Sequence, residues 1–127
     1  MALDTNILIY AAKPGGEKLR DWVQHPGVII SIISRIEALG SPKITPEEKA
    51  ALEELFAFLP EISVTDAIAR RAIAFRQERR VTVADAIIAA TALVYGVPVV
   101  SRNSDDFKGL SGLRVSQNAA AFIFCPN

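Results

Sequence analysis

Four acidic positions that lie far apart in this sequence share one local setting. Each follows an expected strand or enters an expected helix: Asp4, Glu37, Asp85 and an acidic loop around Asp105 and Asp106. In open α/β sheets, ligands bind at the carboxyl edge of the strands, where loops and helix N-termini gather. Carboxylates that meet there repel one another, and a divalent cation relieves the repulsion. The pattern therefore predicts one shared metal site.

The donor atoms indicate which metal this would be. Oxygen ligands without a histidine or cysteine cluster favour Mg²⁺, with Mn²⁺ as a substitute, over zinc. His25 is the single histidine of the chain and cannot build a zinc site by itself. We expect His25 in a surface loop.

Helix capping is the alternative explanation for each acid taken alone. Asp4 fits an N-cap position, and Ser34-x-x-Glu37 and Thr82-x-x-Asp85 both match the capping box. Asp85, however, lies in an otherwise apolar helix start, where burial of an unpaired carboxylate costs on the order of several kcal/mol. Asp4 likewise follows a strand that we expect in the middle of the sheet. These two positions favour a site over capping.

Short apolar segments and helical patterns alternate along the whole chain. Strands are expected at residues 1–3, 28–30, 62–64, 97–100 and 113–115, and helices at 5–13, 17–24, 31–39, 46–58, 66–79 and 83–95. The strongest helix start is Thr45-Pro46-Glu47-Glu48, with an N-cap, a proline at N1 and a capping-box glutamate. The alternation predicts right-handed crossovers and an α/β fold with a parallel sheet covered on both faces. The length of 127 residues predicts one domain, 1–127.

Composition restricts the partners and the compartment. Half of the residues are apolar, 22% are charged and the formal net charge is zero, so no global field attracts nucleic acid or a membrane. The single cysteine, Cys125, excludes an internal disulfide and fits a reducing cytoplasm. No signal-peptide pattern opens the chain, and the most apolar region, 84–100, is too short and interrupted to span a bilayer. We expect a cytoplasmic protein that does not bind membranes.

Basic residues offer a complement to the acids. A cluster falls on one expected helix and its exit, and two further arginines lie beside acid-bearing segments: Arg70, Arg71, Arg76, Arg79 and Arg80, with Arg35 and Arg102. The cluster fits either a solvated face or a phosphate track that leads to a metal centre. Since no aromatic residues interleave with it, base stacking is not indicated.

Four segments, in this order, resemble the PIN-domain ribonucleases, and most of all the toxin half of VapBC-type toxin–antitoxin pairs. They are Leu3-Asp4-Thr5-Asn6-Ile7-Leu8-Ile9, Ser34-Arg35-Ile36-Glu37, Asp85-Ala86-Ile87-Ile88-Ala89-Ala90-Thr91-Ala92 and Ser101-Arg102-Asn103-Ser104-Asp105-Asp106-Phe107. The resemblance implies a three-layer α/β/α domain with about five short strands. It also implies Mg²⁺- or Mn²⁺-dependent cleavage of RNA, a homodimer and a small inhibitory antitoxin encoded beside the toxin.

The resemblance also assigns roles to residues. The first three acids of the family fall on Asp4, Glu37 and Asp85, and the fourth on Asp106, with Asp105 or a neutral oxygen of Asn103 as alternatives.

The resulting expectation is phosphodiester hydrolysis by water that one or two metal ions activate. Asp4, Asp85 and Asp106 would hold the metal together with Glu37, and Glu37 would also orient the water or take its proton. Ser101 would fix the Asp4 carboxylate or a metal-bound water, and Asn6 is a candidate for the same task. Asn103, Arg35 and Arg102 are further candidates that would orient the acids or contact substrate.

Other functions fit the same residues less well or stay as alternatives. An aspartyl-phosphate phosphatase would have a second acid two residues after Asp4, where this chain has Asn6. A dinucleotide-binding domain is excluded because no Gly-x-Gly-x-x-Gly follows any expected strand. A PIN-fold binding protein without catalysis and an RNA-processing nuclease without a toxin role stay as alternatives. An apolar surplus at 50–58 and 119–124 motivates the homodimer, although the tail at 118–124 could instead complete the monomer's core.

Overall fold

The computed structural model describes residues 1–116, in which helices alternate with very short strands. The elements in chain order are β1 (Ala2–Leu3), α1 (Thr5–Ala12), α2 (Glu17–Val23), β2 (Ile30–Ser31), α3 (Ile32–Leu39), α4 (Pro46–Phe58), β3 (Glu61–Ile62), α5 (Asp66–Glu78), α6 (Val83–Val94), β4 (Val99–Val100), the one-turn 3₁₀ helix η1 (Ser104–Asp106) and β5 (Val115–Ser116).

All strand pairings are parallel, and β1 lies in the middle of the sheet. Strands β1, β4 and β5 pair in the order β1-β4-β5, and β2 pairs with β3. A bridge between Ala2 and Ile29 joins the two sets, so the strand order across the sheet is β3-β2-β1-β4-β5. The amide of Leu3 donates to the Ile29 carbonyl oxygen at 3.2 Å in this bridge.

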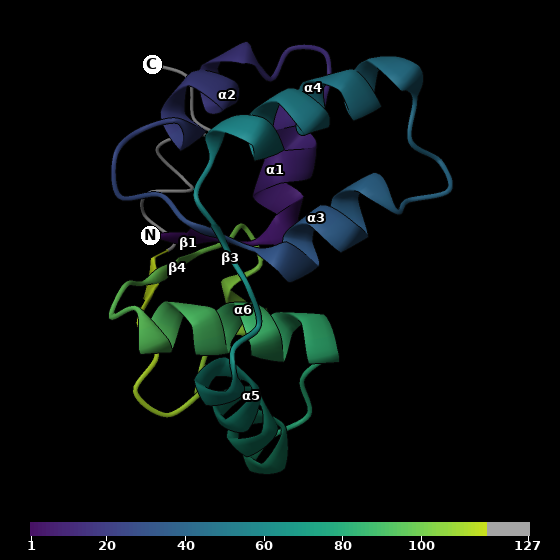
Figure 1. The fold of residues 1–127 in the computed structure, drawn as a ribbon. Coiled ribbons are helices and arrows are strands. Elements are labelled where there is room, and N and C mark those ends of the chain that lie inside the picture. Colours follow the sequence, from purple (N-terminus) through teal and green to yellow (C-terminus); the bar gives the residue numbers. More distant parts are fainter. Residues whose placement is uncertain (117–127) are drawn as a thin grey trace.

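Helices cover both faces of the sheet. Figure 1 shows α1, α2, α3 and α4 on one side and α5 and α6 on the other. Successive strand residues point to opposite faces, so Leu3 and Val100 enter the core under α1 to α4, whereas their neighbours Ala2 and Val99 enter the core under α5 and α6. The predicted three-layer α/β/α architecture is confirmed.

Element boundaries differ from the predicted ones mainly at the strands. Each strand has two residues, and β2 gives way at once to α3, whose first turn Ser31 caps by accepting from the Ile33 amide. The capping box at Thr45 and Glu48 is present with both reciprocal hydrogen bonds. On α5, Ile68, Ala72 and Phe75 are buried, whereas Ile73 is 58% exposed.

Two further expectations concern the C-terminal apolar tail and the absence of a membrane-spanning helix. The apolar tail at 118–124 lies outside the described residues. Among the helices of residues 1–116, none has the length and apolar character that crossing a membrane requires.

Candidate active site

The register between β1 and β4 brings Asp4 beside Ser101. Leu3 pairs with Val100, so the next residue of each strand lies at the same carboxyl edge. Ser101 Oγ donates to Asp4 Oδ2 at 2.8 Å, and the backbone N–H of Asn103 donates to Ser101 Oγ at 3.0 Å. This chain of hydrogen bonds fixes the position of one carboxylate oxygen of Asp4.

Asp4 occupies the N-cap position of α1 without acting as a cap. Its backbone is extended there, but its side chain accepts no capping hydrogen bond from the first turn of the helix. The residue is only 5% exposed. Burial raises the pKa of Asp4, hydrogen bonding by the Ser101 hydroxyl and the Thr5 backbone lowers it, and the charges of Asp106 and Glu37 raise it. The fold thus buries an acid that capping does not explain.

Glu37 is held by a hydroxyl of α1. Thr5 Oγ1 donates to Glu37 Oε1 at 2.7 Å and lies 3.0 Å from the buried hydroxyl of Ser34. The alternative explanation of Glu37 by a capping box with Ser34 is excluded, because the N-cap of α3 is Ser31 and Ser34 lies inside the helix. Glu37 therefore faces the start of α1 and not the start of its own helix.

The role of the Thr5 hydroxyl in this contact was not predicted from the sequence. The available signal was a hydroxyl directly after Asp4, combined with Ser34 one helical turn before Glu37.

Asp85 lies in the first turn of α6, as predicted. The Thr82 hydroxyl accepts from the Asp85 amide at 3.1 Å, which is one half of a capping box. The reciprocal bond from the Thr82 amide to the Asp85 carboxylate is not made, in contrast to the complete box at Thr45 and Glu48. Burial and then the charge of Asp4 raise the pKa of Asp85 to about 6, with smaller contributions from Asp106 and Glu37.

The two acids of η1 have different surroundings. Asp105 is 93% exposed at its side chain and lies 3.4 Å from the Lys108 ammonium. Asp106 is also exposed, but its charge raises the pKa of both Asp4 and Asp85. Charge repulsion thus links Asp4 and Asp85 with Glu37 and Asp106.

The donor set fits a hydrated divalent cation better than a closed metal cage. Buried and half-buried carboxylates with raised pKa values lose their mutual repulsion when a cation binds. Within residues 1–116, however, no three acidic, histidine or cysteine side chains lie close enough to hold a metal together. Mg²⁺ usually keeps several waters and takes one or two carboxylates. The remaining acids would then contact such an ion through water.

Comparison with known proteins places the chain in a family. The family model "PIN domain" matches residues 1–113. The chain belongs to the PIN-domain family. No protein of curated function matches its sequence significantly.

Solved structures of similar fold include several toxin–antitoxin complexes. A chain of a toxin–antitoxin complex from Klebsiella pneumoniae is 29% identical, with a TM-score of 0.69 over 88% of this PIN domain and 93% of that chain. A VapBC-family member from Mycobacterium tuberculosis is 25% identical, with a TM-score of 0.63 over 90% and 97%. DNA-bound VapBC from Salmonella typhimurium, at 24% identity, has a TM-score of 0.77 over 91% and 95% and shows the fold alone.

The remaining predicted contact residues of this PIN domain are mostly engaged within the chain. Arg35 pairs with both carboxylate oxygens of Glu61, at 2.7 and 3.0 Å. The Arg102 guanidinium lies over the Tyr10 ring, 4.5 Å from its centroid. Asn6 and Asn103 are exposed at the acid-bearing edge.

The arginine cluster on α5 is also largely engaged. Arg70 pairs with Asp66 at 2.7 Å. The other contacts go to backbone carbonyl oxygens: from Arg71 to Ser111, from Arg76 to Val81, and from Arg79 to Asp105 and Lys108. These interactions leave little of the cluster for a continuous phosphate track.

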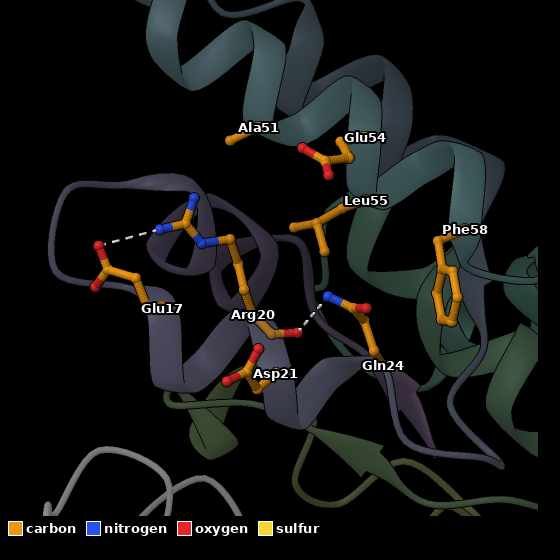
Figure 2. Close-up of a pocket in the computed structure, with 8 residues that line it drawn as sticks. All are labelled: Glu17, Arg20, Asp21, Gln24, Ala51, Glu54, Leu55 and Phe58. Carbon is orange, nitrogen blue, oxygen red and sulfur yellow. Dashed lines mark hydrogen bonds and ion pairs between the residues drawn. The ribbon is translucent and has the colours of Figure 1, made fainter.

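A well-formed cavity of this PIN domain lies away from the acids. Figure 2 shows the side chains that line it, from α2, its C-cap residue Gln24 and α4. The volume of the cavity is about 320 Å³. Its lining residues are Glu17, Arg20, Asp21, Gln24, Ala51, Glu54, Leu55 and Phe58. None of the four acids lines it.

Proposed function

We propose that this PIN domain is a metal-dependent endoribonuclease and the toxin of a toxin–antitoxin pair. The observation that carries the proposal is Asp4: a buried acid at the carboxyl end of the central strand, held by Ser101 and electrostatically coupled to three other acids. A protein does not gather like charges at one edge of its sheet for stability, because their repulsion is unfavourable. Family membership and the toxin–antitoxin complexes of similar fold support the same conclusion.

Asp4, Asp85 and Asp106 are proposed to hold the ion, with Glu37 beside the scissile phosphate. When bound, Mg²⁺ or Mn²⁺ lowers the pKa of water and neutralises the charge that grows on the phosphoryl oxygens. Glu37 takes the proton of the attacking water or orients this water. Thr5 Oγ1 donates to Oε1 of this carboxylate, so Oε2 can accept a hydrogen bond from the water. Ser101 keeps Asp4 Oδ2 in place, and the N-termini of α1 and α6 direct their positive ends at the phosphate.

The direct test is cleavage of a mixed RNA pool by the purified protein with Mg²⁺, with Mn²⁺ and with a chelator. Fragments that appear with either metal and vanish with the chelator support the proposal. If the protein binds RNA without cleaving it under any metal condition, it is a PIN-fold binding protein and the proposal is wrong.

A small antitoxin is the proposed protein partner. We expect it to place an arginine or lysine side chain among the four acids, because they are the strongest local attraction for a cation on a chain of zero net charge. Co-expression with the neighbouring reading frame should give a complex with at least about 100-fold less RNA cleavage than the free protein. A complex that retains full activity would contradict this prediction. If no neighbouring frame encodes a binding partner, the chain is better described as an RNA-processing nuclease.

We also propose a homodimer, on the basis of large apolar side chains that are exposed on several helices. On α4, the side chains of Leu52, Leu55 and Phe56 are buried in the chain's own core. Phe58 is the large apolar side chain of this helix that is exposed. Large apolar side chains are also exposed on α3, α5 and α6: Ile36, Ile73, Val83 and Val94. Light scattering at micromolar concentration should give twice the mass of one chain, and the mass of a single chain would rule the dimer out.

A further inference from the structure

The loop that carries Asp106 is fastened to the end of α5 by one arginine. Arg79, the C-cap residue of α5, donates from both terminal guanidinium nitrogens to the Asp105 carbonyl oxygen at 3.4 Å and from Nη1 to the Lys108 carbonyl oxygen. These two carbonyls flank Asp106 along the chain. The guanidinium therefore spans the backbone on both sides of the acid.

The local structure of η1 explains why this contact matters. A one-turn 3₁₀ helix has few internal hydrogen bonds, and its last carbonyls need partners outside the turn. Within the turn, the Asp106 amide donates to the Asn103 carbonyl oxygen, and the amides of Phe107 and Lys108 donate to the Ser104 carbonyl oxygen. Arg79 supplies donors to carbonyls at the other end of the loop.

Other contacts hold the loop on either side of this point. Phe107 and Leu110 are buried in the same core cluster as Phe75 of α5. Further along, Ser111 donates its amide to Glu78 Oε2 and accepts from Arg71 at its carbonyl oxygen, both at 3.1 Å. These contacts fix the course of the loop, whereas Arg79 acts on the backbone immediately around Asp106.

We propose that Arg79 is a positioning residue of the metal site, which sets the place of Asp106 relative to Asp4 and Asp85 through the carbonyls of Asp105 and Lys108. The inference rests on the proposed function. Arginine suits this task because its planar fork carries five donors, while a lysine ammonium is a point charge that binds one carbonyl well at a time. Arg79, which by its sequence position could belong to a solvated face or to a phosphate track, thus serves the acids and not the RNA.

Arg79→Met is the principal variant, and Arg70→Met is its control. Arg70 lies on the same helix but pairs only with Asp66 of its own first turn, and both side chains are 80% exposed. Titration calorimetry should show Mg²⁺ binding weakened at least about 10-fold in Arg79→Met and unchanged in Arg70→Met, in line with losses of groups that orient metal ligands. The KM for RNA at saturating Mg²⁺ should stay within about twofold of wild type, because the side chain does not contact substrate.

A double-mutant cycle with Asp106→Asn identifies the route of the effect. If Arg79 acts through Asp106, the loss of Mg²⁺ affinity caused by Arg79→Met should shrink to less than about twofold in the Asp106→Asn background. An equal loss in both backgrounds would overturn the inference. So would a raised KM for RNA at unchanged Mg²⁺ affinity, which would make Arg79 a phosphate contact.

Hydrogen exchange provides a readout that is independent of metal and of activity. The amides of Asp106, Phe107 and Lys108 should exchange faster in Arg79→Met than in the wild type or in Arg70→Met. If Arg79→Met does not fold, Arg79→Lys replaces it, and its amides and Mg²⁺ affinity should resemble those expected of the methionine variant. A wild-type protein that binds no Mg²⁺ would remove the proposed function and this inference together. A wild type that binds Mg²⁺ with the same affinity as Arg79→Met would remove the inference alone.

Discussion

Asp4→Asn should lower RNA cleavage by at least about 100-fold, which corresponds to roughly 3 kcal/mol of activation free energy. The change removes one formal negative charge from the buried centre of the site and leaves the size of the side chain almost unchanged. The amide oxygen of asparagine can still accept the hydrogen bond from Ser101 Oγ, which is 2.8 Å long in the structure. The loss is therefore expected from metal binding and not from a rearranged loop.

The stability of the same variant separates catalysis from structure. Because burial and the charges of Asp106 and Glu37 raise the pKa of Asp4, the ionised side chain is unfavourable in the metal-free fold. We expect metal-free Asp4→Asn to unfold at the same temperature as the wild type or higher. A drop in stability of more than about 1 kcal/mol would mean that the carboxylate has a structural role that asparagine cannot fill.

Two matched variants complete the test. Glu37→Gln keeps an acceptor for Thr5 Oγ1 and should lose activity by a similar factor, because it removes the proposed proton acceptor. Glu48→Gln is the control: it makes the same substitution in the one complete capping box among residues 1–116, away from the four acids. This variant should cleave RNA like the wild type. Full activity in Asp4→Asn would disprove the proposed function.

The sequence predicted the fold well because its local signals agree with its packing. Thr45, Pro46 and Glu48 define a helix start that tertiary contacts do not alter, and both halves of their capping box form. The strand bounds were less predictable. A short apolar segment does not indicate where the hydrogen bonds between two strands end. Strand β2 ends at Ser31 because this residue is the N-cap of α3.

The site was predictable as a set of residue types but only in part as a geometry. The expected contact between Ser101 and Asp4 is confirmed, and the register between β1 and β4 produces it. By contrast, Ser34 and Glu37 have the spacing of a capping box, yet the helix starts three residues earlier and turns both side chains to Thr5. In the sequence, the arginines of α5 form one basic cluster. In the structure, Arg71 and Arg79 donate to different backbone carbonyl oxygens far along the chain, those of Ser111 and Lys108.

Asp85→Asn should have opposite effects on stability and on activity. The folded chain raises the pKa of Asp85 from 3.8 to about 6, by burial and by the charge of Asp4. The folded state therefore binds this proton more tightly than the unfolded state. The resulting stability is complete below about pH 4 and is lost as the pH rises through about 6. Above that pH, the metal-free wild type carries a carboxylate that its own fold disfavours, and asparagine removes this cost.

Melting curves between pH 4 and 8 in the presence of a chelator measure this difference. Metal-free Asp85→Asn should melt higher than the wild type by about 2–4 °C at pH 7.5, with the advantage growing between pH 4 and 7 and then constant. The partial exposure of the side chain keeps the effect this small. Glu48→Gln provides a control of opposite sign. Hydrogen bonds from Lys13 and Thr45 lower the pKa of Glu48, so this variant should melt lower than the wild type at pH 7.5, and the gap should close as the pH falls.

Millimolar Mg²⁺ should then reverse the order of Asp85→Asn and the wild type. The wild type gains stability by binding the ion in its folded state only, while Asp85→Asn lacks one of the acids and gains less. Cleavage of RNA by Asp85→Asn should fall at least about 100-fold at the same Mg²⁺ concentration. If Mg²⁺ raises the melting temperature of both proteins equally, the ion binds elsewhere, and the raised pKa of Asp85 reflects burial without a metal site.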